Sequence, residues 1–286
     1  MNGKNRSEGW KSAKLLGHKN EEIIYEKLKN DLKFRQNLFN RLNIKDKFKD
    51  VFESGLNEKS IYSILGDKIK KKSDITIILE NDNYLNLSIK KSKSGQVHFI
   101  TVDRFIDGFE MQFKKVIPEK IKKAIHLFWG LDYENYIIED IIIEYGTNPQ
   151  YENRKHRIVA ETLKSYDSNL NNSLINWFKE NIYEITLFCF SIGLVKENKY
   201  FAEYVWYTNF VDDENLDIIF NIKDIAELSK KYSNKIYYGK KNGGSTISLP
   251  FGFVQWHQGK IQFHHNLESI QELFKNESVL KTYKKY

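Results

Sequence analysis

Three polar residues stand out in the sequence because together they have the chemical groups needed to hydrolyse a phosphodiester. Asp74 follows Lys72-Ser73, and after thirteen further residues come Ser88 and Lys90. A carboxylate oxygen can hold a hard cation such as Mg²⁺, which lowers the pKa of a bound water and polarises a phosphate. A lysine can stabilise the negative charge that develops on the phosphate. The pattern alone is weak, because a carboxylate followed by a strand that ends in lysine is common.

Two strands joined by a turn would bring these residues together. Residues 74–79 predict a strand, the Glu-Asn-Asp-Asn run at 80–83 predicts a turn, and residues 84–91 predict a second strand. The alternation along the second strand places Ser88 and Lys90 on one face. If the two strands form a hairpin, Asp74 lies across from them.

The rest of the chain predicts a mixed α/β or α+β fold. Residues 20–42 predict one helix, with Asn20 as its N-cap. Further helices are predicted at 102–113, 118–129, 156–163, 170–187 and 225–231, and strands at 200–209, 216–222, 246–249 and 253–263, while 137–145 fits either. No repeat or long linker divides the chain, so we expect a single domain over 1–286 with a polar N-terminal tail at 1–14.

Charge and composition favour a polyanionic partner. The formal net charge is +7, and residues 230–241 contain five lysines and no acid. A solvated lysine face explains such a cluster equally well. The single cysteine, Cys189, cannot form an internal disulfide, which indicates a cytoplasmic setting. No apolar run reaches the roughly 20 residues of a membrane span, so no membrane partner is expected.

Several motifs, taken in order, resemble the PD-(D/E)XK nuclease superfamily and, within it, the MspI-like type II restriction endonucleases that cut four-base palindromes. Gly17-His18-Lys19-Asn20-Glu21 resembles the opening helix of that group, and Lys72-Ser73-Asp74-Ile75 resembles a strand of its active site. The later matches are Ile89-Lys90 with Lys93, Gly95 and Gln96, then residues 176–181, 201–205 and 247–249. No single motif is specific, but the ordered set covers about 17–274.

The resemblance implies a nuclease core in which a central mixed sheet is flanked by helices. It also implies a Mg²⁺-dependent, site-specific deoxyribonuclease that acts on double-stranded DNA within a restriction–modification system, with a cognate DNA methyltransferase as genetic partner. A homodimer on a palindromic site and a monomer both stay open. So do two other functions, namely a repair or junction nuclease on the same fold and a non-catalytic DNA-binding module.

The resemblance also assigns roles to residues of the hairpin. Asp74 matches the metal-binding aspartate and Lys90 the catalytic lysine, and the carbonyl of Ile89 is a further predicted ligand. Two residues before the lysine, the family usually has Glu, Asp, Gln or Asn. This chain has Ser88 instead, which is a poor metal ligand, so a carboxylate is missing from its usual place.

Other residues are candidates for the missing carboxylate. Glu110, in the helix predicted at 102–113, is our first choice, and Asp103 and Asp107 compete with it. Glu21 is the other candidate metal ligand, although a role at the start of its helix fits it equally well.

Polar groups predicted to bind DNA fall in two segments. The first follows the lysine strand directly and contains Lys91, Lys93, Ser94, Gln96 and His98. Its lysines suit phosphates, and Gln96 suits a base edge. The second is a glycine-rich segment with Lys240, Lys241, Asn242 and Ser245, where the glycines would let the loop approach DNA closely. The alternative for this segment is a plain hairpin turn with surface lysines.

Overall fold

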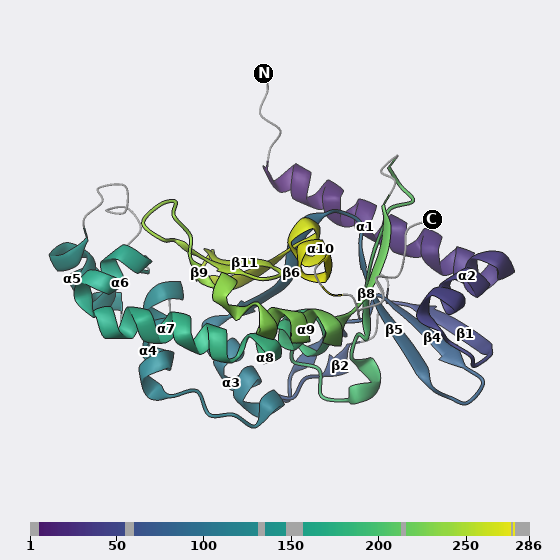
Figure 1. Cartoon of the computed structure of the whole chain (residues 1–286), viewed down its shortest axis with the longest axis horizontal. Coiled ribbons are helices and arrows are strands. Elements are labelled where there is room, and N and C mark those ends of the chain that lie inside the picture. Colours follow the sequence, from purple (N-terminus) through teal and green to yellow (C-terminus); the bar gives the residue numbers. More distant parts are fainter. Residues whose placement is uncertain are drawn as a thin grey trace, which may run out of the picture. The chain divides into compact units, whose positions relative to one another are not determined.

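The computed structural model describes residues 6–54, 60–130, 135–146, 157–212, 216–275 and 277 (Figure 1). They group into two compact units. The first comprises the described parts of Met1–Lys93 and Phe190–Asp224, and the second those of Ser94–Cys189 and Ile225–Ser278. Each unit has a five-stranded sheet of its own. The predicted single domain stays a prediction, and residues 1–5 of the predicted tail lie outside the described residues.

The first unit contains a mixed sheet. Its strand order is β1 (Phe48–Glu53), β4 (Ile75–Leu79), β5 (Tyr84–Lys90), β7 (Tyr204–Thr208) and β8 (Asp217–Asn221). Strands β5 and β7 are parallel and the other neighbours are antiparallel. A separate small hairpin joins β2 (Ile61–Tyr62) to β3 (Lys68–Ile69). The predicted β4–β5 hairpin is confirmed, and strand β1, which the sequence analysis did not predict, extends it.

Two helices, α1 (Arg6–Asn30) and α2 (Leu32–Leu42), pack on this sheet through a shared apolar core. The prediction of one helix over 20–42 is wrong in its start and in its continuity. The chain breaks at Asp31, whose side chain caps α2 by accepting a hydrogen bond from the Phe34 N–H at 3.0 Å. Part of the predicted tail, residues 6–14, belongs to α1.

Asn20, the predicted N-cap, lies inside α1 and is fully buried. Its side chain donates to the carbonyl of Thr208 and accepts from the N–H of Phe210. Both partners follow from tertiary packing, because they are almost 190 residues away in the chain. Asn20 therefore ties α1 to the end of β7.

The second unit contains an antiparallel sheet with the order β6 (Ser94–Thr101), β12 (Lys260–Asn266), β11 (Gly252–His257), β10 (Thr246–Leu249) and β9 (Tyr237–Tyr238). One prediction fails here. Residues 253–263 are not one strand, because Gln258 and Gly259 adopt positive φ and turn the chain into a β11–β12 hairpin. The segment after Lys93, for which the sequence analysis predicted no element, forms strand β6.

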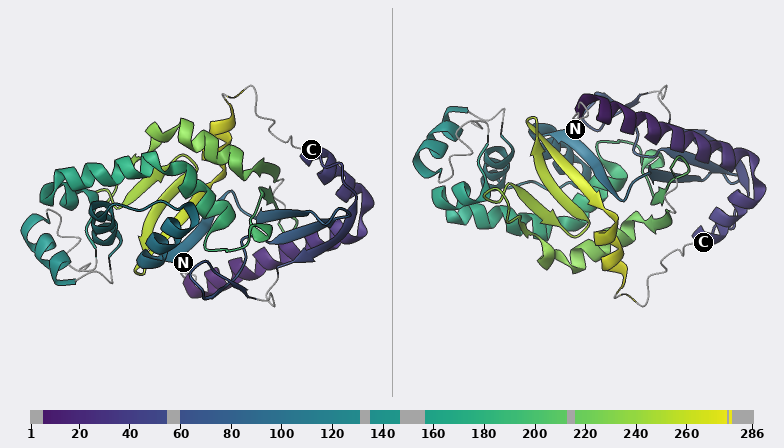
Figure 2. Two further views of the ribbon diagram at one scale, coloured as in Figure 1. Left: turned by 90° about the horizontal axis from the view of Figure 1, so that it is seen from below. Right: turned by 90° about the horizontal axis from the view of Figure 1, so that it is seen from above.

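Helices of the second unit, among them α3 (Val102–Phe113), α4 (Glu119–Trp129) and α7 (Ser168–Glu180), lie on one side of this sheet, as the two views in Figure 2 show. The unit also contains α5 (Asn135–Tyr145), α6 (Ala160–Tyr166), α8 (Ile182–Leu187) and α10 (Leu267–Lys275), and the chain passes from the first unit to the second within α9 (Ile222–Lys231). Buried rings of Phe105, Phe109 and Phe188 fill the core.

The helix predictions for this unit are largely confirmed. Helices α3 and α4 match 102–113 and 118–129, and Pro118 caps α4. The ambiguous segment 137–145 is helical. The helix predicted over 170–187 is interrupted at Asn181, which separates α7 from α8. The helix predicted from 156 begins only at Ala160, and His156 itself lies outside the described residues.

Candidate active site

The carboxylate of Asp74 is held in place by the end of strand β5. Its Oδ2 accepts hydrogen bonds from the Ile89 N–H at 2.6 Å and from the Ser88 hydroxyl at 3.2 Å. The backbone N–H of Asp74 donates to the Leu87 carbonyl, so the chain cannot shift without breaking the sheet. Among the described residues, none donates a hydrogen bond to the other carboxylate oxygen, Oδ1. One oxygen is thus fixed by the protein and the other is open to a ligand.

Lys90 completes this cluster from the last position of β5. Its ammonium donates to the Ser88 hydroxyl at 2.9 Å and to the Ile89 carbonyl at 3.1 Å, and it lies 3.9 Å from Asp74 Oδ2. Ser88 therefore accepts from the lysine and donates to the aspartate. The structure brings together the three residues of the predicted constellation, and it shows that the serine orients both charged groups.

Glu21 on α1 belongs to the same electrostatic environment. Its side chain is 14% exposed, and its Oε2 lies 3.1 Å from Nδ1 of His18. Burial raises the pKa of Glu21 to about 8, the negative charge of Asp74 adds to the rise, and the positive charge of Lys90 opposes it. Carboxyl groups with a perturbed pKa in a partly buried cluster are frequent at functional sites. A bound cation would relieve the repulsion between their charged forms.

Glu53, at the end of β1, was not singled out by the sequence analysis. Burial raises its pKa, and Glu53 in turn contributes to the raised pKa of Glu21. A strand prediction over residues 48–53 would have been the signal for it, because β1 pairs with β4 and places Glu53 opposite Ile75, the neighbour of Asp74. Glu53 adds negative potential to the cluster.

The oxygen atoms of this cluster fit magnesium. Asp74, Glu21 and the Ile89 carbonyl offer hard oxygen donors, and Mg²⁺ uses one or two carboxylates and completes its coordination with waters and phosphate oxygens. Within the described parts of the chain, no three His, Cys, Asp or Glu side chains are grouped as a metal site. A site for Mg²⁺ here would thus depend on the two carboxylates, with the substrate and waters providing the rest.

Glu110, our first choice for the missing carboxylate, lies in the second unit and has contacts there. Its Oε1 accepts a hydrogen bond from the Ile117 N–H at 2.6 Å and pairs with Lys122 at 3.1 Å. These bonds hold the segment between α3 and α4. Of the competitors, Asp103 lies 3.4 Å from His126. A metal-binding role for Glu110 stays a prediction, and its contacts explain it as a structural residue.

The residues predicted to bind DNA after β5 separate into two groups. Lys93, Ser94 and Gln96 are exposed, whereas Lys91 forms an ion pair with Asp212. His98 points to the inner side of its sheet, with its ring 5.1 Å from that of Phe188. The cause is a bulge in β6 that changes the register between the partners of Phe263 and His264.

The glycine-rich segment forms the turn between β9 and β10, and its lysines are exposed together with Asn242. Its glycines also pack the loop against the rest of the unit, while their predicted approach to DNA stays a prediction. Gly243 and Gly244 are buried, and a Cβ at Gly244 would lie 2.6 Å from the Cβ of Ala160. The Gly243 carbonyl accepts from the Glu161 N–H. The glycines therefore dock the loop on α6, and the Ser245 carbonyl accepts from Arg157.

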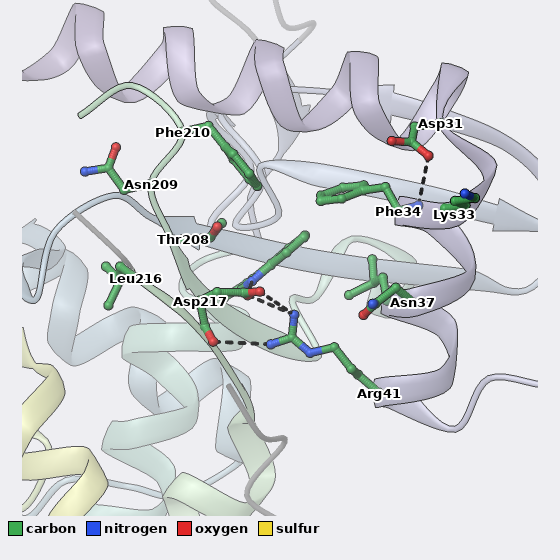
Figure 3. Close-up of a pocket in the computed structure, with 12 residues that line it drawn as sticks. Asp31, Lys33, Phe34, Asn37, Arg41, Thr208, Asn209, Phe210, Leu216 and Asp217 are labelled. Carbon is green, nitrogen blue, oxygen red and sulfur yellow. Dashed lines mark hydrogen bonds and ion pairs between the residues drawn. The ribbon is translucent and has the colours of Figure 1, made fainter. Parts of the chain in front are cut away.

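A pocket of about 450 Å³ lies elsewhere in the first unit, beside α2 and strands β7 and β8 (Figure 3). In its lining, Nη1 of Arg41 donates to both carboxylate oxygens of Asp217, at 2.8 and 3.0 Å, and Trp206 donates to the same carboxylate. Arg41 and Asp217 neutralise each other, and the rest of the lining combines apolar residues such as Phe34 and Phe210 with polar ones such as Lys33. None of Asp74, Ser88 or Lys90 lines it.

Comparison with known proteins adds a likeness of fold. No family model and no curated protein matches the sequence. The structure is similar to that of the restriction endonuclease MspI in complex with its cognate DNA, with a TM-score of 0.50 and 16% identity over 87% of this chain and 88% of that chain. The chain has a restriction-endonuclease fold. The predicted mixed α/β architecture, with a central mixed sheet flanked by helices, is confirmed. Within the described residues, no helix has the length and apolar character of a membrane span.

Proposed function

We propose that this protein is a Mg²⁺-dependent endonuclease that cleaves duplex DNA at a short specific sequence, as type II restriction endonucleases do. The observation that carries the proposal is the hydrogen-bonded cluster of Asp74, Ser88 and Lys90 on the mixed sheet. The fold, shared with a restriction endonuclease whose structure is a complex with DNA, supports the choice of substrate. A cognate DNA methyltransferase that protects host DNA is part of the proposal.

In the proposed mechanism Lys90 acts on the scissile phosphate. Its ammonium is fixed by the Ser88 hydroxyl and the Ile89 carbonyl, and it lies 3.9 Å from Oδ2 of Asp74. A positive charge held in a fixed position stabilises the extra negative charge of the transition state without reorganisation. Asp74 is oriented by Ser88 and by the Ile89 N–H, and it would hold Mg²⁺ together with Glu21 and the Ile89 carbonyl. Bound Mg²⁺ would supply an activated water and charge neutralisation.

Glu21 is our proposal for the second carboxylate. It shares a partly buried, negatively charged site with Asp74, whereas Glu110 is engaged by Ile117 and Lys122. Protonated Glu21 would have to lose its proton when a cation binds, because only the carboxylate is a strong ligand. Metal affinity should therefore rise with pH up to about 8.

The test is digestion of plasmid and phage DNA by the full chain with Mg²⁺ and with EDTA, followed by sequencing of the ends. Discrete fragments with a common end sequence are expected with Mg²⁺ and none with EDTA. The Asp82→Asn variant is a matched control, because Asp82 is an exposed aspartate in the turn of the same hairpin. It should cut as the parent does. Undiminished cleavage in EDTA would refute the metal requirement.

One observation favours a second candidate, a DNA-binding module that does not cleave. Ser88 occupies the place where the resembling family usually has a metal-binding or amide side chain. If the protein binds duplex DNA tightly but leaves plasmid, phage and branched DNA intact with Mg²⁺ or Mn²⁺, this second function replaces the first. Cleavage restricted to branched DNA would indicate a junction nuclease.

A further inference from the structure

The sheet of the second unit has one buried face and one accessible face. Directly opposed residues on antiparallel strands share a face, and Ile247, Val254 and Phe263 belong to the buried one. The other, which we call the outer face, consists of residues that are each partly or fully exposed: Ser94, Gln96, Phe99, Thr101, Tyr237, Thr246, Ser248, Phe253, Gln255, His257, Lys260, Gln262, His264 and Asn266. Figure 2 shows the strands of this sheet open to view from above.

The outer face has no negative charge. None of its residues is Asp or Glu, although these make up 38 of the 286 residues of the chain, and Lys260 adds a positive charge. Burial, together with the charge of His257, lowers the pKa of His264, so that its ring is neutral at neutral pH. A broad polar surface without acids can approach a polyanion without electrostatic repulsion.

Three glutamines form a row across neighbouring strands of the outer face. The Gln255 amide on β11 donates to Gln262 on β12 at 2.9 Å, and Gln262 donates to Gln96 on β6 at 2.8 Å. The Gln255 amide also lies 3.2 Å from Nε2 of His264. Among the described residues, no partner is found for the Gln96 amide nitrogen or the Gln255 amide oxygen. The row therefore ends in one open donor and one open acceptor.

The bulge in β6 is what allows this row to form. It places Gln96 opposite His264, on the outer face, and His98 opposite Phe263, on the buried face. Bulges often redirect a side chain at a functional site. His264 is fixed as well, because it stacks on Phe253 with ring centres 4.5 Å apart and planes 5° from parallel.

The row holds long side chains that are normally mobile. Ordering a free glutamine side chain costs up to about 2 kcal/mol. Where neighbouring amides already hold one another, a ligand that binds to them avoids much of this cost. Carboxamides have no charge for phosphate, but they combine a donor with an acceptor, which is the pattern that base edges such as those of adenine present.

From these features we infer that the outer face, centred on Gln96, Gln255 and Gln262, contacts the base edges of duplex DNA and sets the sequence preference of the protein. The inference rests on the proposed function, because it takes DNA as the substrate. It assigns sequence reading to the second unit and the hydrolytic residues to the first. Phosphate contacts fall to the exposed lysines, including Lys240 and Lys241.

The test measures the sequence preference of DNA binding in a chain that should not cleave. The chain with Asp74→Asn is used to select duplexes from a random library, and its affinities for the selected duplex and for an unrelated duplex are compared. Adding Gln262→Thr, which breaks the row at its centre, should reduce the ratio of these affinities by about 5- to 100-fold, the range for loss of one good base contact. The affinity for the unrelated duplex should stay within about twofold.

Two kinds of control make the result specific. Gln36→Ala changes an exposed glutamine on α2, outside the outer face, and should leave the ratio unchanged. Replacing Lys240 and Lys241 by Ala should weaken binding to both duplexes equally. If Gln262→Thr does not fold, as judged by circular dichroism, Gln96→Ala at the exposed end of the row takes its place and should also reduce the ratio.

Several outcomes would overturn the inference: no sequence selected by the Asp74→Asn chain, an unchanged ratio in the row variants, or an equal loss of affinity for both duplexes. The proposed function is judged separately by cleavage with the unaltered chain. A chain that cuts at one sequence while the row variants keep its preference refutes only the inference. A chain that never cuts but loses its preference with Gln262→Thr refutes only the nuclease.

Discussion

The two sheets place their polar residues in different ways. In the first unit β5 has a parallel neighbour and is buried along 85–89, so polar residues on it must satisfy one another. Thr76 donates to Asn86, and Asn86 donates to the Lys199 carbonyl. In the second unit alternate residues of β12 are accessible, and their polar groups could equally bond to water. Since an unmet buried hydrogen bond costs about 1–3 kcal/mol, the first arrangement is the more rigid.

The electrostatic contrast between the sheets follows the same division. Carboxyl groups lie near the end of the first sheet, where the charge of Asp74 contributes to the raised pKa of Glu21. None lies on the outer face of the second sheet. A hydrolytic site needs charged groups that are held in fixed positions. A surface that reads DNA needs polar groups without negative charge, because negative charge would repel the phosphates. A change of a single atom should therefore matter most in the rigid cluster of the first unit.

The largest effect is expected from loss of the charged groups beside Ser88. Asp74→Asn and Lys90→Ala should each reduce the cleavage rate by at least about 100-fold, the scale for removing one preorganised group that stabilises charge. Far-ultraviolet circular dichroism and binding to DNA should be unchanged. Rates are measured on supercoiled plasmid with Mg²⁺, with Asp82→Asn as control. Near-normal cleavage by either variant would separate this cluster from catalysis.

A smaller loss should distinguish the two glutamates. Glu21→Gln should require on the order of 10- to 100-fold more Mg²⁺ for half-maximal cleavage, the scale for groups that support a metal site. Glu110→Gln should cut with the parent's Mg²⁺ requirement, because its partners Ile117 and Lys122 are structural. The measurement is a Mg²⁺ titration of the initial rate. The reverse result would restore Glu110 as the second carboxylate.

Glu21 should also make folding depend on pH when no divalent cation is present. Its pKa is about 8 in the folded chain and near 4.5 when exposed, so between these values the folded state keeps a proton that the unfolded state has lost. The stabilising contribution is thus complete below pH 4.5 and is lost as the pH rises to 8. Urea midpoints from pH 5 to 8.5 should fall less steeply in Glu21→Gln than in the parent. If the urea midpoints of Glu21→Gln and of the parent fall in parallel with pH, the raised pKa of Glu21 is contradicted.

The smallest expected effect concerns the exposed loop of the second unit. Replacing both Lys240 and Lys241 by Ala should make the slope of log binding constant against log salt shallower by about 2, since each phosphate contact contributes roughly 0.9. Lys45 and Lys47, which are exposed on the first unit, serve as a matched double control. Binding is measured by fluorescence anisotropy at several salt concentrations. An unchanged slope would show that the loop does not contact phosphate.

Local patterns were sufficient for part of this structure. The alternation of 84–90 and the turn at 80–83 predicted the hairpin that joins Asp74 to Ser88 and Lys90, because side chains on a strand alternate by geometry. Predictions failed where one or two residues change the direction of the chain. Asp31 breaks the first helix, and Gln258 with Gly259 divides one expected strand into two.

The sequence by itself thus determined the composition of the cluster of Asp74, Ser88 and Lys90, the hairpin that carries it and the basic character of the chain. Only the tertiary structure decided which other residues join it. Glu21 approaches Asp74 because α1 packs on the sheet, and Gln96 meets Gln262 because a bulge changes the register of β6. Such neighbours are far apart in the chain, and no local periodicity records them, since their distances depend on how whole elements pack.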